Sequence, residues 1–253
     1  MKEFKRLFFL ITIFCFFSCA SKKNIVYMQN SQNTEATNSY EPYLQPDDVL
    51  LLIISSENPE IAAPYNLKSI SLDDNFDESK GNDKIQTYII DTNGNIEIPI
   101  LGSIHLAGLT KTEAVLKIKE ELKEHVKDAV VNLRILNFKI SVLGEVSKPG
   151  SYAVKSERIT ILEALSLAGD LTIYGKRNNI LLIREQNGNK IMERIDITKS
   201  DFINSPYYYL SQNDVVYVEP NKTRVNTSLI GPNLTVGISA ISLIITIIAL
   251  TTR

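Results

Sequence analysis

The chain has 253 residues, and its 27 basic and 29 acidic side chains give a formal net charge of −2. This balance argues against nucleic-acid binding, which needs a strongly basic surface. The only histidines are His105 and His125, so a histidine metal cluster is not available, and we expect no metal site and no cofactor.

The N-terminus has the order of a secretory signal peptide, with three basic residues, an apolar run over residues 7–17, and the small residue Ser18 before Cys19. This order resembles a bacterial lipoprotein signal, in which the cysteine becomes the lipidated first residue. Cys15 fits less well because a bulky residue precedes it. We therefore predict a signal peptide over residues 1–18 and lipidation at Cys19; the alternative is a plain signal peptide with two incidental cysteines.

Two details of this region bear on where the protein resides. Phe16 and Phe17 occupy positions where smaller or aliphatic residues are usual, and this looseness resembles signals of the Bacteroidetes type. Residues 20–23 lack the acidic cluster that directs such lipoproteins to the cell surface, so a periplasmic body is favoured. Residues 19–42, rich in polar side chains, are predicted to form a lipidated tether.

The first half of the body, residues 43–137, has signals of both strands and helix. A polar turn leads into a continuous apolar run after Asp48, the pattern of a buried strand. Asn93-Gly94 joins two strand-like segments, residues 87–91 and 95–100, and predicts a hairpin. An acidic stretch follows the first strand and includes Asp73, but it lacks the glycine and the final acid of a calcium loop and is predicted to be a solvated loop.

A helix and a strand complete this half. Thr110 and Glu113 form a predicted capping box, in which each side chain satisfies the other residue's free backbone amide. The helical face that follows carries Val115, Ile118, Leu122 and Val126. A last strand is predicted to present Val131, Leu133 and Ile135 on one face.

The second half, residues 138–221, is predicted to be a small sheet holding one short helix. Lys148-Pro149-Gly150 and Asn187-Gly188 mark two hairpins, and Thr160 and Glu163 form a second capping box. The segment Leu210-Ser-Gln-Asn-Asp214-Val repeats the leucine, polar turn and aspartate of Leu44-Gln-Pro-Asp-Asp48-Val. Three consecutive tyrosines, Tyr207, Tyr208 and Tyr209, are candidate glycan contacts, although aromatic residues beside a strand are more often core or interface residues.

The C-terminal segment carries no charge between Arg224 and Arg253. Residues 234–250 would rise about 26 Å as a helix, and with residues 229–233 about 33 Å. We predict a transmembrane helix over residues 229–251; the alternative is a buried C-terminal helix.

Small and hydroxyl side chains recur along this segment at intervals of four and three, which places them on one helical stripe. Such residues gather where membrane helices approach one another or meet water, so this stripe is predicted to face the lumen or a helix seam. A chance placement in a single anchoring helix is the alternative. The stripe consists of Thr235, Ser239, Ser242, Thr246 and Ala249.

Several motifs stand in an order that resembles the polysaccharide export lipoproteins, the outer-membrane channels for capsule and exopolysaccharide. Residues 44–49, 91–102 and 107–110 match the export domain, and residues 142–152 and 162–170 are similar to the start of a soluble-ligand-binding β-grasp (SLBB) domain. The main departure is size, because longer relatives carry further β-grasp repeats. The resemblance implies an α+β fold: an export domain of mixed sheet with one amphipathic helix, an SLBB domain, and a C-terminal transmembrane helix.

The same resemblance implies the partners. They are further copies of this chain in a ring-shaped homo-oligomer, the polysaccharide, the lipid bilayer of the outer membrane, and an inner-membrane polysaccharide co-polymerase or tyrosine kinase. Two other classes stand beside this prediction. One is a monomeric envelope lipoprotein that binds glycan without forming a channel; the other is an enzyme, which is disfavoured because no nucleophile or carboxylate pair has a partnered base.

Overall fold

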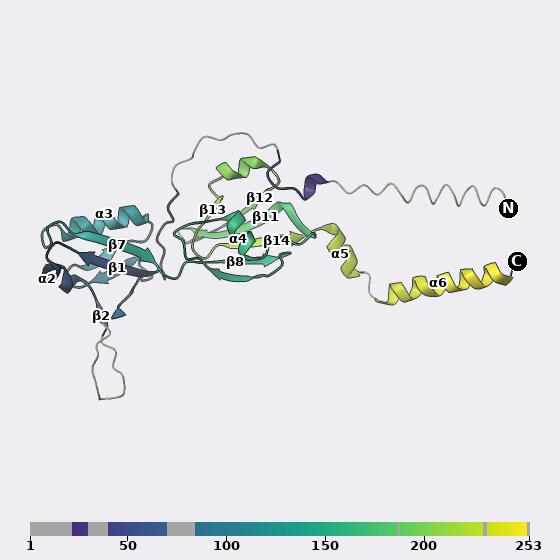
Figure 1. Ribbon diagram of the computed structural model, residues 1–253, viewed down its shortest axis with the longest axis horizontal. Helices are drawn as coiled ribbons and strands as arrows, with labels where there is room; N and C mark the ends of the chain where they lie inside the picture. The colour runs from purple at the N-terminus through teal and green to yellow at the C-terminus, as the bar shows by residue number, and fades with distance from the viewer. Residues whose placement is uncertain (1–21, 30–39, 70–83, 187, 230–231, 252–253) are drawn as a thin grey trace, which may run out of the picture.

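The computed structural model describes residues 22–29, 40–69, 84–186, 188–229 and 232–251. Two halves lie one after the other along the long axis, each built around its own hydrophobic core, and two helices extend beyond the second half (Figure 1). The expected acidic loop around Asp73, the residue Asn187 and the lipidation site Cys19 lie outside the described residues.

The first half has a three-stranded antiparallel sheet in the order β4-β1-β7, covered by helix α3. The capping box predicted at Thr110 and Glu113 is confirmed, and Ala114, Ile118 and Leu122 face the core. The elements are β1 (Val49–Ser55), α2 (Pro59–Ala62), η2 (Ala63–Tyr65), β2 (Lys68–Ser69), β3 (Lys84–Ile85), β4 (Tyr88–Ile89), β5 (Asn95–Ile98), β6 (Gly102–His105), α3 (Lys111–Leu122) and β7 (Val130–Ile135).

The hairpin expected at Asn93-Gly94 is wrong in its strand pairing. The turn itself forms, since the Gly94 amide donates to the Asp91 carbonyl over 2.9 Å, but β5 pairs with β6 rather than with β4. The Gly94 carbonyl accepts the amides of Leu106 and Ala107, which draws the turn toward the end of β6. A Cβ at Gly94 would lie 2.5 Å from the ring of His105, so this close approach requires glycine.

The second half holds a five-stranded sheet in the order β12-β11-β14-β8-β9, in which β14 and β8 are parallel. Helix α4 packs into its core, and the capping box predicted at Thr160 and Glu163 is confirmed. The elements are β8 (Lys139–Gly144), β9 (Gly150–Ala153), β10 (Ile159–Thr160), α4 (Ile161–Leu167), β11 (Gly175–Gln186), β12 (Asn189–Ile195), η3 (Ser200–Asn204), β13 (Tyr209–Leu210) and β14 (Val215–Pro220).

The two aspartate turns that the sequence repeats have the same geometry. The Asp48 carboxylate accepts the Gln45 amide over 2.9 Å, and the Asp214 carboxylate accepts the Ser211 amide over 2.7 Å. The residue before each aspartate has a positive φ, +68° and +64° respectively. Each aspartate is fully buried and opens a core strand, so the same local device starts β1 in one half and β14 in the other.

The aspartates differ in their charge partner. Asp214 binds the guanidinium of Arg184, whereas Asp48 has no hydrogen-bond partner for Oδ1 among the described residues. Burial therefore raises the pKa of Asp48 to about 6.

The junction between the halves is held by two side-chain amides. Asn137 accepts the Val49 amide over 2.9 Å and donates to the Asp47 carbonyl over 2.9 Å. Gln212, from the second half, donates to the Asn137 carbonyl over 2.9 Å and accepts the Lys139 amide over 2.8 Å. The connecting segment is thus bonded to both halves and fixes their relative placement.

The N-terminal segment before the first half docks on the second half, which the tether prediction did not anticipate. It begins with η1 (Lys22–Asn24), and the amides of Met28 and Gln29 donate to the carbonyls of Ile197 and Thr198 over 3.1 and 2.7 Å. The Tyr27 hydroxyl donates to Asp170 over 2.6 Å. We call residues 22–29 the N-terminal strap.

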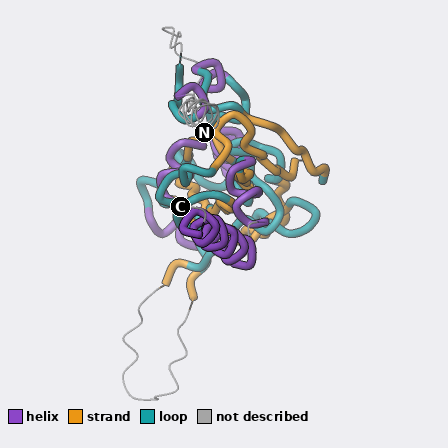
Figure 2. Tube along the Cα trace, turned by 90° about the vertical axis from the view of Figure 1, so that its right-hand side faces the viewer, coloured by secondary structure: helices purple, strands orange, loops and turns teal. Residues whose placement is uncertain are grey.

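The predicted transmembrane helix is wrong. The segment forms two separate helices, α5 (Lys222–Leu229) and α6 (Pro232–Thr251), which extend from the end of the second half (Figures 1 and 2). In the described part of the chain no helix combines the length and apolar character needed to cross a membrane. Leu229 lies outside α6 because the helix starts at Pro232, and Asn233, Thr235 and Gly237 reduce the apolar character of its first turns.

The buried, unpaired carboxylate of Asp48 makes folding stability depend on pH. Because its pKa rises from an ordinary 3.8 to about 6 on folding, the native state loses up to about 3 kcal/mol as pH rises through this range. Asp48→Asn keeps an oxygen for the Gln45 amide and never ionises. We expect the free energy of unfolding of this variant to exceed that of wild type at pH 8, and we expect the difference to be much smaller at pH 4. Urea unfolding at the two pH values measures this difference.

Asp128→Asn is the matched control, since Asp128 is exposed and its φ of +56° suits asparagine equally well. This control should change the free energy of unfolding little at either pH. A gain for Asp48→Asn that is the same at pH 4 and pH 8 would contradict the assigned ionisation.

Candidate functional site

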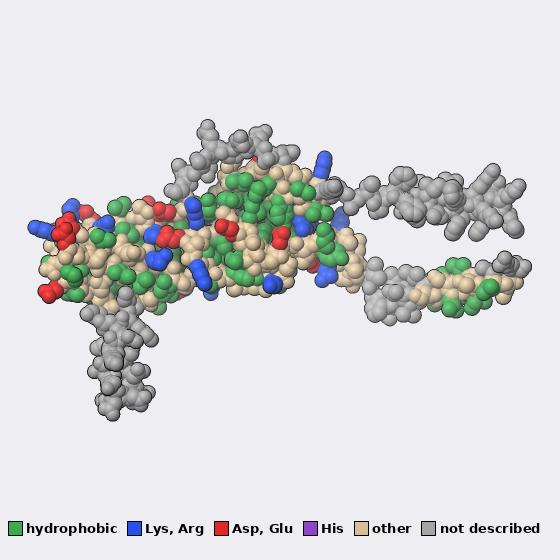
Figure 3. Space-filling model, viewed as in Figure 1, with side chains coloured by type: hydrophobic (Ala, Val, Ile, Leu, Met, Phe, Trp, Pro, Cys, Tyr) green, Lys and Arg blue, Asp and Glu red, His purple; other side chains and the backbone are tan. Residues whose placement is uncertain are grey.

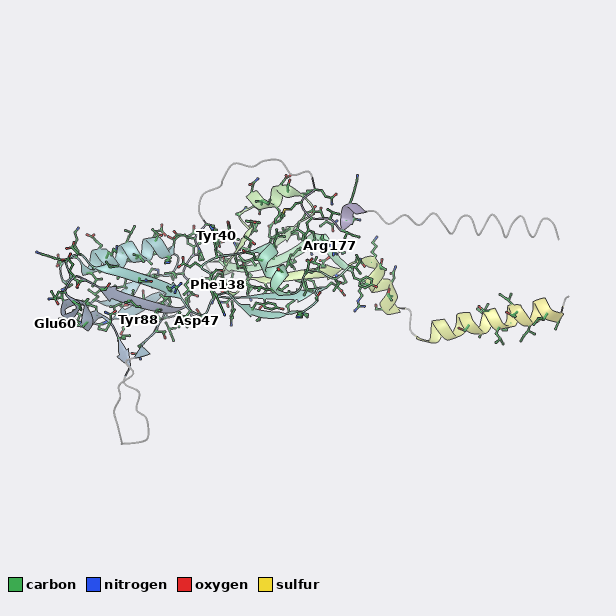
Figure 4. All side chains as sticks on the ribbon, viewed as in Figure 1. Tyr40, Asp47, Glu60, Tyr88, Phe138 and Arg177 are labelled. Carbon is green, nitrogen blue, oxygen red and sulfur yellow. The ribbon has the colours of Figure 1, made fainter. Side chains whose placement is uncertain are left out.

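An open cleft with a volume of about 1650 Å³ lies between the two halves. The first half contributes the entering segment around Tyr40 and Tyr43, the turn at residues 92–94 and the start of α3. The second half contributes the β11–β12 hairpin end and residues 203–213. Figure 4 places Tyr40, Asp47 and Phe138 at this junction, far from Arg177 at the opposite end of the second half.

The predicted tyrosine run lies at this cleft, but two of its rings are engaged within the protein. The Tyr209 ring stacks on Tyr40 with centroids 4.9 Å apart, and the Arg158 guanidinium lies 5.5 Å from its centroid. Tyr208 meets Tyr209 edge-on at 5.0 Å and packs against buried Phe202 at 5.7 Å. Tyr208 and Tyr209 therefore tie the entering segment to the second core.

Tyr207 and Tyr43 line the cleft more openly. The Arg184 guanidinium lies 5.6 Å from the Tyr207 centroid, which is within cation–π range. Tyr43 is 50% exposed, and its ring makes no aromatic contact with another described residue. The sequence predicts Tyr207 as a candidate contact but not Tyr43, which does not belong to a run of consecutive tyrosines.

The only cation among the described lining residues is already bound. Arg184 donates to both oxygens of Asp214 over 2.7–3.2 Å and to the Tyr209 carbonyl over 2.9 Å. Burial alone would lower the pKa of Arg184, but the hydrogen bonds and charge of Asp214 raise it. With side-chain exposures of 9% and 0%, the two form a buried ion pair in the cleft wall.

The N-terminus of α3, which also faces the cleft, is occupied by carboxylates. Glu41 accepts the Thr112 amide over 3.1 Å and the Thr112 hydroxyl over 2.7 Å. These hydrogen bonds lower the pKa of Glu41. Glu113 closes the capping box on Thr110. The positive end of the helix dipole is therefore compensated by the chain itself.

The other predicted site residues lie away from the cleft. Ser239, Ser242 and Thr246 are exposed on α6, where the Thr246 hydroxyl donates to the Ser242 carbonyl over 2.8 Å. Thr235 and Ala249 belong to the same helix, but their side chains are outside the described set. Among described residues, no group of histidine, cysteine, aspartate and glutamate side chains is placed to hold a metal ion.

Family comparisons match both halves of the body. Residues 36–136 match the polysaccharide biosynthesis/export protein family, and residues 138–218 match the SLBB domain family. The boundary between the matches falls at Asn137, the residue whose side chain and carbonyl bond to the two halves.

Two relatives carry the name EPS I polysaccharide export outer membrane protein EpsA. The one from Ralstonia solanacearum is 27% identical over 184 residues, which cover 72% of this chain and 48% of the relative. The one from Ralstonia nicotianae is 31% identical over 147 residues, covering 56% of this chain and 39% of the relative. The chain thus matches less than half the length of either curated relative.

Removing one partner of the buried Arg184–Asp214 pair should be among the most destabilising changes of polar side chains in the second half. Asp214→Ala leaves a buried guanidinium and the Ser211 amide unpaired, so we expect a loss of about 3–5 kcal/mol in the free energy of unfolding. The measurement is chemical denaturation of the purified variant.

Glu219→Ala is the control for this pair. Hydrogen bonds from Arg194 and Lys176 lower the pKa of Glu219 to about 2, yet both partners are at the surface. Surface pairs of this kind contribute about 1 kcal/mol or less. A cost for Asp214→Ala no larger than that for Glu219→Ala would contradict the structural role of the buried pair.

Proposed function

We propose that this chain, which carries a polysaccharide biosynthesis/export domain followed by an SLBB domain, is a subunit of an outer-membrane channel that exports capsular polysaccharide or exopolysaccharide. The consecutive order of the two domains carries the proposal. The 184-residue alignment with a polysaccharide export outer membrane protein is longer than either domain match, so it extends over both. This chain matches less than half of that relative, so the shared order of domains is what supports the export role.

A conduit formed by several copies fits the architecture of the body. Each half is filled by its own core, so a glycan chain has no path through a half. A ring of copies related by cyclic symmetry would enclose a conduit with repeated head-to-tail contacts. The alternative, a monomeric glycan-binding lipoprotein, requires no such contacts.

Helix α6 supports self-association. It stands apart from the body and displays large apolar side chains such as Ile241, 59% exposed, and Leu250, 70% exposed (Figure 3). Exposed apolar surface of this extent favours a partner that covers it. In this proposal the stripe of Thr235, Ser239, Ser242, Thr246 and Ala249 is the seam at which α6 helices of neighbouring copies approach.

The proposed lipid anchor agrees with the position of the N-terminal strap. Only Ala20 and Ser21 separate Cys19 from the strap, which is bonded to the SLBB half. A lipid on Cys19 would therefore hold the SLBB half nearest the outer membrane. The export domain would reach into the periplasm toward an inner-membrane polysaccharide co-polymerase or tyrosine kinase.

Deleting the gene should abolish surface polysaccharide, and wild-type protein supplied in trans should restore it.

Cys19→Ser should lose incorporation of a palmitate analogue and restore less glycan, because two or more acyl chains provide stable attachment. Cys15→Ser is the control and should behave as wild type. Undiminished surface glycan in the deletion strain would refute the export role, and equal labelling of Cys19→Ser would refute the anchor.

The ring predicts a single large species in mild detergent. Native mass measurement should give a defined multimer. Converting Ser239, Ser242 and Thr246 to leucine should keep neighbouring α6 helices apart, so the multimer should dissociate into species of lower mass. Ile241→Leu and Ile245→Leu conserve volume and should leave the multimer intact. A monomeric wild-type mass would instead favour the glycan-binding lipoprotein.

A further inference from the structure

We propose that the cleft between the two halves is a binding site for an uncharged stretch of the exported glycan, held by open side-chain amides and by the ring of Tyr43. The inference rests on the proposed function for the identity of the polymer. It adds where the polymer is bound and which chemical class of sugar the site accepts.

The cleft is lined by several amide side chains without a hydrogen-bond partner among the described residues. Five of them make no side-chain hydrogen bond to any residue that the structure describes: Gln45, Asn93, Gln186, Asn204 and Asn213. An amide offers both donors and an acceptor, which is the combination that neighbouring sugar hydroxyls or N-acetyl groups can satisfy. Because these amides come from both halves, a bound chain would contact the export domain and the SLBB domain together.

Tyr43 supplies an aromatic surface beside these amides. Its backbone is fixed by a β-bridge to Thr110, while half of its side-chain surface remains exposed. A ring that is apolar on its face and polar at its hydroxyl suits a sugar, whose ring presents C–H groups on its faces and hydroxyls at its edge. Tyr209 cannot serve in this way, since Tyr40 stacks on its ring.

The charges of the cleft select against acidic glycans. Among the described residues, its lining includes the carboxylates of Glu41, Asp47, Glu113 and Glu185 and a single cation, Arg184. Arg184 is bound to Asp214, and the start of α3 is bound to Glu41. An anionic sugar would therefore meet these carboxylates with no open cation among the described lining residues. The site is thus expected to repel uronates as well as to fit neutral sugars.

The dimensions suit a segment of polymer rather than a small molecule. A volume of about 1650 Å³ exceeds the roughly 300–1,000 Å³ of ordinary ligand pockets. The cleft is also open to solvent, so a long chain can enter from the side without threading an end.

Calorimetric titration of the purified full-length protein tests the site. The probes are three neutral hexasaccharides, maltohexaose, cellohexaose and chitohexaose, and one acidic probe, hexagalacturonate. We expect wild-type protein to bind at least one neutral probe and to bind it more tightly than hexagalacturonate. Tyr43→Ala, Gln186→Ala and Asn204→Ala, all at exposed positions, should each weaken this binding about fivefold, the effect of losing one such contact.

Tyr174→Ala is the matched control, because Tyr174 lies beside Arg224 outside the cleft and should leave affinity unchanged. Circular dichroism checks that every variant is folded. The site is refuted if wild type binds none of the neutral probes, if hexagalacturonate binds as tightly or more tightly, or if Tyr43→Ala binds like wild type. It is also refuted if the cleft variants dissociate the multimer, because the cleft would then be a contact between copies.

The outcome separates this inference from the proposed function. Loss of surface glycan on gene deletion, together with no binding of any probe, would refute the cleft site and leave the export role standing. Unchanged surface glycan on deletion would refute the export role, whatever the affinity of the cleft.

Discussion

The relative placement of the two halves depends on a small set of hydrogen bonds around Asn137 and Gln212. Each of these amides satisfies one donor and one acceptor of the backbone, at the start of β1 for Asn137 and at the start of β8 for Gln212. Phe138 lies between the bonded residues Asn137 and Lys139 and is buried in the second core. Its burial anchors the connecting segment to the second half. Because the cleft has one wall from each half, this junction contributes to its width, together with the ion pair of Lys111 with Glu157 that also joins the halves.

The repeated aspartate turn shows how one local device can serve two electrostatic purposes. In both halves the carboxylate closes a turn and starts a core strand. In the second half Arg184 forms an ion pair with the aspartate. Its guanidinium is therefore not available to a ligand in the cleft. In the first half Asp48 receives only the Gln45 amide, so its charge opposes folding above its raised pKa. Burial raises the pKa of Asp214 as well, although Arg184 opposes this rise, and residues of both turns line the cleft.

The sequence predicts those features of the fold, such as helix caps, that depend on residues close together in the chain. Both predicted capping boxes are present, and Ile118 and Leu122 of the predicted apolar face are buried, because each signal depends on residues within one or two helical turns. Val126 is buried as well, but it lies beyond the end of α3. The pairing of β5 was missed because the turn at Gly94 is drawn to β6 by contacts that only the folded sheet creates. The C-terminal prediction failed because an apolar window does not reveal that the helix restarts at Pro232. Of the cleft, only Tyr207 and its neighbours were named, since residues 40–47 and 203–213 meet through the junction rather than through any sequence pattern.

The described parts of the N-terminal segment contact the second half before the chain enters the first half. The strap bonds to the second half, and Tyr40 then stacks on Tyr209 of that same half before the chain enters the first core. The residue that follows, Glu41, caps α3 in the first half and forms part of the cleft wall. A pull on the N-terminus would therefore be borne by the SLBB half at the strap, and a second time at Tyr40, before it reached Glu41. The contacts of the strap with the second half therefore lie between Cys19 and the residues of the entering segment that line the cleft.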